Sequence, residues 1–86
     1  MSYELEVSED LYKVFKKLDK KDRKQLEQIN KKVLEIRENP NIGKPLKKPM
    51  QGRRRVHVGS FVLFYSVDEI RRTVKLLDYD HHDKAY

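Results

Sequence analysis

The sequence has no cysteine and no long apolar run. Without cysteine, the chain can form neither a disulfide framework nor a metal site with thiolate ligands. No apolar stretch approaches the roughly 18 residues that a membrane span needs, and no leader-like segment opens the chain. Its 86 residues suit one domain, residues 1–86, with a thin core. These absences predict a cytoplasmic protein without a membrane partner.

Acidic residues are missing from one stretch, residues 39–58, and the net charge of the whole chain comes from this stretch. Six basic residues lie in that stretch: Lys44, Lys47, Lys48, Arg53, Arg54 and Arg55. The formal net charge of the chain is +6, so basic and acidic residues balance elsewhere. A basic block unrelieved by acids is typical of a surface that binds phosphate or an acidic protein.

The first half of the chain has the pattern of one strand followed by two helices. Residues 3–7 alternate apolar and acidic side chains, so the apolar ones should face a core. Ser8 fits a helix N-cap, and Asp22 offers a second one. The second helix should end at Asn39-Pro40, because the residue before proline disfavours helical geometry. So short a break between the helices predicts an antiparallel helix hairpin.

The second half has the pattern of a loop followed by three strands. Prolines and glycines make a regular helix improbable between residues 39 and 52. Strand-like runs then cover residues 53–58, 61–67 and 73–79. The order β-α-α-β-β-β predicts an α+β fold, an antiparallel sheet with the N-terminal helix hairpin packed on one face.

Strand alternation assigns side chains to the two faces of this sheet. Val56 and Val58 should point to the helices, which leaves Arg53, Arg55 and His57 on the uncovered face. In the next strand, alternation places Phe61, Leu63, Tyr65 and Val67 in the core, and Val62, Phe64 and Ser66 on the uncovered face. The simplest interpretation is a solvated face with a few basic residues. A phosphate-binding site is the alternative.

The order and spacing of several motifs resemble the RelE/ParE superfamily of toxins from toxin–antitoxin pairs. The run "ENPNIGKPLKKPMQGRRRVHVGSFVLFYSVDE" is similar to that family's helix end, loop, basic strand, following strand and acidic turn. The closing "DYDHHDKAY" resembles the family's last strand and terminal tyrosine. The resemblance covers essentially the whole chain.

This resemblance implies a function and a set of site residues. RelE-like members are ribosome-dependent mRNA endonucleases that need no metal, and ParE-like members poison DNA gyrase. The expected function is therefore mRNA cleavage in the ribosomal A site, neutralised by a RelB-like antitoxin, with no cofactor and no small-molecule substrate. The resemblance and the face assignment together suggest Arg55, His57, His82 and Tyr86 as catalytic residues. The expected RNA-binding residues are Lys47, Lys48, Arg53, Arg54 and His81.

One position departs from the family pattern. Where the family usually has an arginine taken to steady the scissile phosphate, this chain has Val62. Arg53 or Arg55 could supply the missing charge from the same face. The departure also favours an alternative function, a basic RNA- or ribosome-binding module with a degenerate catalytic site. Gyrase poisoning is the third possibility.

The residue types fit metal-free RNA cleavage. The 2′-hydroxyl next to the scissile phosphate serves as nucleophile, so the site needs a proton acceptor, a proton donor and positive charge. Histidine can fill either proton role, and arginine grips phosphate oxygens with two parallel hydrogen bonds. A metal site at His81-His82 is not expected, because neighbouring strand residues point to opposite faces. A frayed tail is the plain alternative for this segment.

Overall fold

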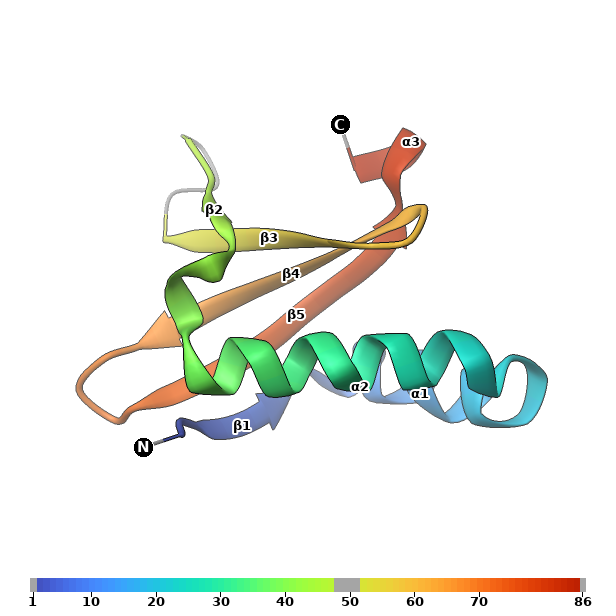
Figure 1. Ribbon diagram of the computed structural model, residues 1–86, viewed down its shortest axis with the longest axis horizontal. Helices are drawn as coiled ribbons and strands as arrows, with labels where there is room; N and C mark the ends of the chain where they lie inside the picture. Colours follow the sequence, from blue (N-terminus) through green and yellow to red (C-terminus); the bar gives the residue numbers. More distant parts are fainter. Residues whose placement is uncertain (1, 48–51, 86) are drawn as a thin grey trace.

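The computed structural model of the chain describes residues 2–47 and 52–85, with side chains up to Asp83. The elements are β1 (Glu4–Val7), α1 (Glu9–Lys21), α2 (Arg23–Glu38), η1 (Pro40–Ile42), β2 (Lys44–Pro45), β3 (Arg53–Val58), β4 (Phe61–Asp68), β5 (Thr73–His81) and α3 (His82–Ala85). The long helices α1 and α2 lie together along one side of the sheet, and α3 stands near the β3–β4 turn (Figure 1). Within the described ranges, no helix has the length and apolar character of a membrane span. The α+β class and the expected order of the main elements are confirmed.

Both long helices begin at the caps that the sequence predicts. Ser8 Oγ accepts a hydrogen bond from the Leu11 N–H at 3.3 Å and donates one to the Leu77 carbonyl at 3.1 Å. Asp22 ends α1 and caps α2, where its Oδ1 accepts a hydrogen bond from the Gln25 N–H at 3.1 Å. Such caps satisfy N–H groups that the first turn of a helix leaves open. Because Asp22 alone joins α1 to α2, the chain doubles back as a hairpin.

The sheet has five strands in the order β1-β5-β4-β3-β2, and one of its pairs is parallel. The first strand, β1, runs parallel to the last one, with Glu4 opposite Thr73, while the other pairs are antiparallel. The sheet is therefore mixed rather than wholly antiparallel. The short edge strand β2 also lies in a segment expected to be a loop. An edge position tolerates Pro45, which cannot donate to the hydrogen-bond ladder.

The core lies between the helices and the sheet. Val56 and Val58 are 8% and 5% exposed within it, which confirms their expected face. From α2, Ile29 and Ile36 are fully buried against the sheet. Leu63, Tyr65, Val74, Leu76 and Tyr79 complete the sheet side of this core.

Two expectations about burial are wrong in part. Leu5 and Val7 were expected to face the core, but they are 36% and 37% exposed because β1 is an edge strand. Val62 and Phe64 were expected on the open side, yet they are 0% and 6% exposed. Their strand, β4, is flanked by β3 and β5, so neighbouring side chains on that face can cover them. The uncovered face thus has an apolar floor of its own.

Candidate RNA-binding and catalytic site

The sheet face opposite the long helices, here called the outer face, brings most of the expected site residues of β3 together. Arg53 and His57 are exposed and Arg55 is half-buried, while the alternate residues Val56 and Val58 point into the core. Alternation along a regular strand accounts for this arrangement. The outer face includes Arg53, Arg55 and His57 of β3, Val62, Phe64 and Ser66 of β4, and Lys75, Asp78 and Asp80 of β5.

Strand pairing orders these residues into three rows across the sheet, and the row of Arg53, Ser66 and Lys75 lies furthest from the β3–β4 turn. In one row Lys44 of β2 lies opposite Arg55, which lies opposite Phe64, and Phe64 is paired with Asp78. Directly opposed residues have their side chains on the same face, within about 5.5 Å at Cβ. The first row therefore places an ammonium beside the Arg55 guanidinium, over the apolar Phe64.

The second row runs from His57 through Val62 to Asp80. Its two ends are separated by two strand spacings, roughly 10 Å. Val62 forms the floor between the imidazole and the carboxylate and is fully buried. A valine leaves this gap without the guanidinium that the family usually places there.

The pairing also decides which arginine can replace that missing charge. Arg55 belongs to the neighbouring row and is thus a diagonal neighbour of Val62. Arg53 pairs with Ser66, four residues further along β4, which is roughly 13 Å away along the strand. Arg55 is therefore the better placed of the two.

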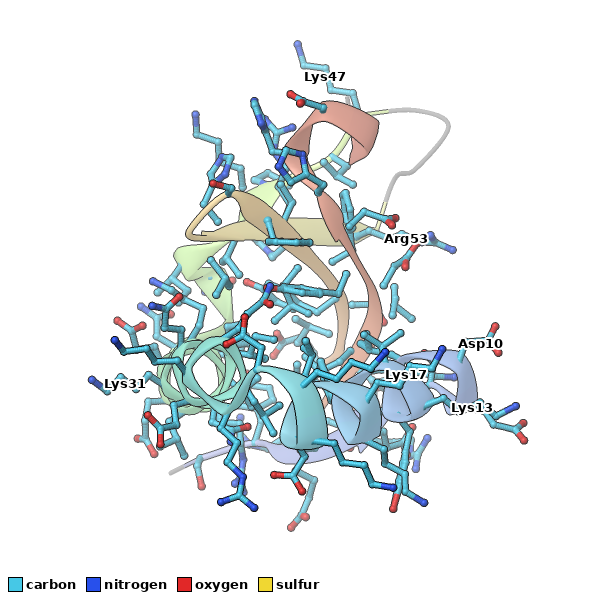
Figure 2. All side chains as sticks on the ribbon, turned by 90° about the vertical axis from the view of Figure 1, so that its right-hand side faces the viewer. Asp10, Lys13, Lys17, Lys31, Lys47 and Arg53 are labelled. Carbon is cyan, nitrogen blue, oxygen red and sulfur yellow. The ribbon has the colours of Figure 1, made fainter. Side chains whose placement is uncertain are left out.

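The other expected RNA-binding residues of this region are dispersed. Arg54 lies on the opposite side of β3, where its Nη1 donates a hydrogen bond to the Gly43 carbonyl at 2.8 Å. This contact gives Arg54 a structural role in the fold. Lys47 is exposed and projects away from the helix pair, as does Arg53 (Figure 2). Lys48 lies outside the described residues.

The closing segment lies at the end of the sheet beside the β3–β4 turn. The His82 N–H donates a hydrogen bond to the Ser60 carbonyl at 3.0 Å, which anchors the segment there. His81 pairs with Phe61 and meets its ring edge-on, with the ring centroids 5.3 Å apart. Phe61 packs against the core, so His81 lies on the helix side of the sheet and not on the face of His57. Tyr86 lies outside the described residues.

The expected divergence of the two adjacent histidines is also wrong. Because β5 ends at His81 and α3 begins at His82, their ring centroids approach to 6.0 Å. The Asp83 carboxylate lies 3.6 Å from His81 Nδ1 and 3.3 Å from His82 Nδ1. Potential ligand atoms of the three residues lie within 4.8 Å of one another, so they could hold a metal ion. The expected absence of a metal ion at this site stays a prediction, and it now rests on the proposed chemistry alone.

A buried tyrosine fixes the segment that precedes the basic strands. Tyr65 Oη donates a hydrogen bond to the Pro40 carbonyl at 2.6 Å and accepts one from the Gly43 N–H at 3.0 Å. Burial raises the pKa of Tyr65, so its hydroxyl stays protonated and able to donate. A Cβ added at Gly43 would collide with this hydroxyl, so glycine allows the close approach. The hydroxyl and Arg54 together hold η1 and β2, and hence Lys44, against the sheet.

Three residues of the site escaped the sequence reasoning: Lys44, Asp78 and Asp80. Lys44 lay in a stretch read as loop, and nothing local predicted its pairing with Arg55. The two aspartates alternate with Leu77 and Tyr79, and this alternation was a usable signal for a shared face. Their carboxylates limit the positive charge at the β5 side of the outer face.

Comparison with known proteins identifies the family of this chain. Residues 2–86 match the family described as the ParE toxin of the type II toxin–antitoxin system parDE. A Methanocaldococcus jannaschii protein named "Putative toxin RelE4" is 46% identical, over 98% of this chain and 90% of that protein. A Methanosarcina mazei protein is 52% identical, over 98% of this chain and 99% of that protein.

A solved structure shows the same fold. A chain in the toxin–antitoxin complex RelBE2 from Mycobacterium tuberculosis aligns with a TM-score of 0.82 at 23% identity. The alignment covers 95% of this chain and 100% of that one. With the family match over residues 2–86, the conclusion is that this chain belongs to the RelE/ParE superfamily and is the toxin of a type II toxin–antitoxin system.

Proposed function

We propose that this toxin is a metal-independent endoribonuclease that cleaves mRNA in the A site of the translating ribosome. The observation that carries the proposal is the pairing of β3 with its neighbours, which places Lys44 and His57 around Arg55 at one end of the outer face. Fixed positive charge beside an imidazole is the combination that phosphate-ester cleavage needs.

The proposed reaction is an internal transesterification of the RNA. The 2′-oxygen attacks the adjacent phosphorus and the bond from phosphorus to the 5′-oxygen breaks. One side chain accepts the 2′-hydroxyl proton and another donates a proton to the leaving 5′-oxygen. The products are a 2′,3′-cyclic phosphate and a 5′-hydroxyl, so no water or metal enters this step.

Each proposed catalytic residue has a role in that step. Arg55 binds the phosphate oxygens as negative charge develops on them. His57 and His82 carry the two proton transfers, from β3 and from the segment anchored at the adjacent turn. Tyr86 stacks on a base or donates a proton in their place. Lys47, Lys48 and Arg53 contact the RNA backbone, His81 binds RNA at the end of the sheet, and Arg54 acts through the loop that it holds.

A RelB-like antitoxin is the proposed partner. The structurally similar RelBE2 protein is named as a toxin–antitoxin complex, which supports a protein partner of that kind. The basic residues 39–58 would attract an acidic segment by charge complementarity.

The test is to add the purified toxin to translating ribosomes and map the mRNA ends. We expect new 5′ ends within codons in the A site, and none on the same mRNA without ribosomes. A mock reaction with Arg55→Ala protein provides the control. Unchanged mRNA ends at saturating toxin would contradict nuclease function.

Gyrase poisoning is the second candidate function. The matching family model describes ParE toxins, and Val62 removes the arginine taken to steady the scissile phosphate. In that case the outer face would bind gyrase and cut no bond. Accumulation of cleaved DNA in a purified gyrase reaction, with intact mRNA in the ribosome assay, would favour it. Binding to ribosomes or RNA with no cleavage of either nucleic acid would instead favour a degenerate RNA-binding module.

A further inference from the structure

A basic groove runs along the open edge of β3, between this strand and α2. Two adjoining cavities, of about 420 and 400 Å³, make up the groove, and both are lined by Lys32, Glu35 and His57. Arg55 also lines the larger cavity. The groove therefore meets the outer face at Arg55 and His57, the residues proposed to act on the phosphate.

The charge of the groove favours a polyanion. Its lining contains four basic residues, Lys31, Lys32, Lys44 and Arg55, and one acidic residue, Glu35. Lys32 Nζ lies 3.2 Å from Glu35 Oε2, and Glu35 is 58% exposed, so solvent screens this pair. The groove keeps a clear excess of positive charge beside the proposed cleavage site.

One wall of the groove is fixed before any ligand arrives. Ile42 and Lys44 form this wall, and the two hydrogen bonds of the fully buried Tyr65 hydroxyl hold the segment that carries them. A preformed wall lowers the ordering cost of binding, which is the reason to expect a specific site here.

We propose that this groove is a second subsite for single-stranded RNA, which binds the sugar–phosphate backbone next to the cleaved phosphate. Lys32 and Lys44 bind phosphates from opposite walls, and the strand turns from the groove onto the outer face at Arg55 and His57. The proposal rests on the proposed nuclease function and adds a path for the substrate to it.

The test measures binding of a fluorescein-labelled 2′-O-methyl oligouridylate, which lacks the nucleophile and so cannot be cut. Lys32→Ala and Lys44→Ala should each weaken binding several-fold and lower the salt dependence by about 0.7 in slope. Glu35→Gln should tighten binding, a gain that a folding defect cannot imitate. Lys13→Ala is the matched control, because Lys13 projects from α1, on the other side of the molecule from Lys31 of α2 (Figure 2).

The possible outcomes separate this proposal from the nuclease function. If the groove variants bind RNA like Lys13→Ala, or Glu35→Gln leaves the affinity unchanged, the groove proposal is wrong. A poly-glutamate peptide is tested in parallel, and an effect of the variants on the peptide alone would assign the groove to an acidic protein. Failure of the wild-type chain to bind the RNA also overturns the subsite. Ribosome-dependent cleavage is measured separately and decides the nuclease function.

Discussion

Val62 bears on how the proposed catalytic task is divided among its neighbours. It forms a fully buried floor between His57 and Asp80 on the outer face. In the proposed reaction, the charge that a guanidinium at this position would supply comes from the adjoining row, where Arg55 lies opposite Lys44. Activity should therefore depend on Arg55 more steeply than in a protein with two arginines at the phosphate.

The first residue-level prediction concerns Arg55 and His82. Arg55→Ala and His82→Ala should each lower mRNA cleavage at least about tenfold, because one removes phosphate binding and the other a proton transfer. Growth arrest on expression should weaken in parallel, while thermal unfolding changes little. Lys13→Ala is the control, since it removes a positive charge from α1, on the other side of the molecule from Lys31 of α2 (Figure 2). Full toxicity of both variants at equal protein level would refute the site.

The second residue-level prediction concerns metal at His81, His82 and Asp83. Cleavage should survive a chelator, because the proposed step uses the RNA hydroxyl and the Arg55 charge. No stoichiometric zinc should copurify with the chain, since the proposed step gives a metal ion at these residues no role. Elemental analysis checks this point, and about one zinc per chain would contradict it.

Residue patterns predicted local features of the fold better than the relations between distant strands. The caps at Ser8 and Asp22 depend on neighbouring residues and were predictable. The parallel pairing of β1 with β5 depends on contacts between the two ends of the described chain, which no local pattern encodes.

The helix-side location of His81 was missed for a more specific reason. Phe64 pairs with Asp78 and Tyr65 with Leu76, so Leu77 is an extra residue in β5. A bulge of this kind reverses which alternate residues face the core. Every side chain after Leu77 changes face, and this places Tyr79 and His81 on the helix side. The sequence carries one sign of the bulge, because the apolar positions shift from Val74 and Leu76 to Leu77 and Tyr79.

At the scale of elements, η1 and β2 connect the helix hairpin to the basic strand. This connection has few contacts of its own, and the Tyr65 hydroxyl and the Arg54 guanidinium hold its backbone. A buried polar group with both hydrogen bonds satisfied gives the segment one defined position. The placement of Lys44 beside Arg55 therefore depends on a residue of the central strand β4.

We predict that Tyr65→Phe lowers the free energy of unfolding by about 1–3 kcal/mol, since the Pro40 carbonyl and the Gly43 N–H lose a buried partner. Tyr12→Phe is the control, because Tyr12 is 49% exposed. Urea denaturation at neutral pH measures both variants. Equal stabilities of the two variants would contradict the assigned role of the hydroxyl.

The same tyrosine predicts a dependence of stability on alkaline pH. Burial raises the folded-state pKa of Tyr65 above its ordinary value of 10.0, so the unfolded chain releases this proton first. The Tyr65 contribution is intact below pH 10 and is lost as pH rises through the folded pKa. The free energy of unfolding should therefore fall less steeply above pH 10 in Tyr65→Phe than in the wild-type chain. Parallel curves of unfolding free energy against pH for Tyr65→Phe and the wild-type chain would contradict this prediction.

At the scale of the whole molecule, the basic residues 39–58 account for the whole excess of positive charge. The groove and the outer face share Arg55 and His57, so the basic surface continues around the edge of β3. The thin core expected of so short a chain gives only modest stability. A partner that binds the folded form would raise this stability by mass action.

We predict that the chain occurs in a tight complex with a small, acidic, partly disordered antitoxin. Acidic residues of the antitoxin should lie near Arg53, Arg55 or the lysines at 47 and 48, and its helices over apolar grooves of the toxin. The test is to co-express the toxin with the neighbouring open reading frame and to ask whether the two proteins copurify. The charged contacts should weaken with salt and the apolar ones should not. Recovery of free, harmless toxin that does not bind the neighbour would contradict the prediction.

The parallel pairing of β1 with β5 also affects when the toxin can become active during its own synthesis. β1 emerges from the ribosome well before its partner strand β5, because the helix hairpin and the strands β2 to β4 lie between them in the chain. His82, which is anchored to the Ser60 carbonyl, comes later still. The sheet and the proposed site therefore cannot be completed while β5 and His82 are still inside the ribosome. We expect a stalled nascent chain that lacks β5 to be protease-sensitive and inactive, so that a toxin directed at translating ribosomes would spare the one that is making it.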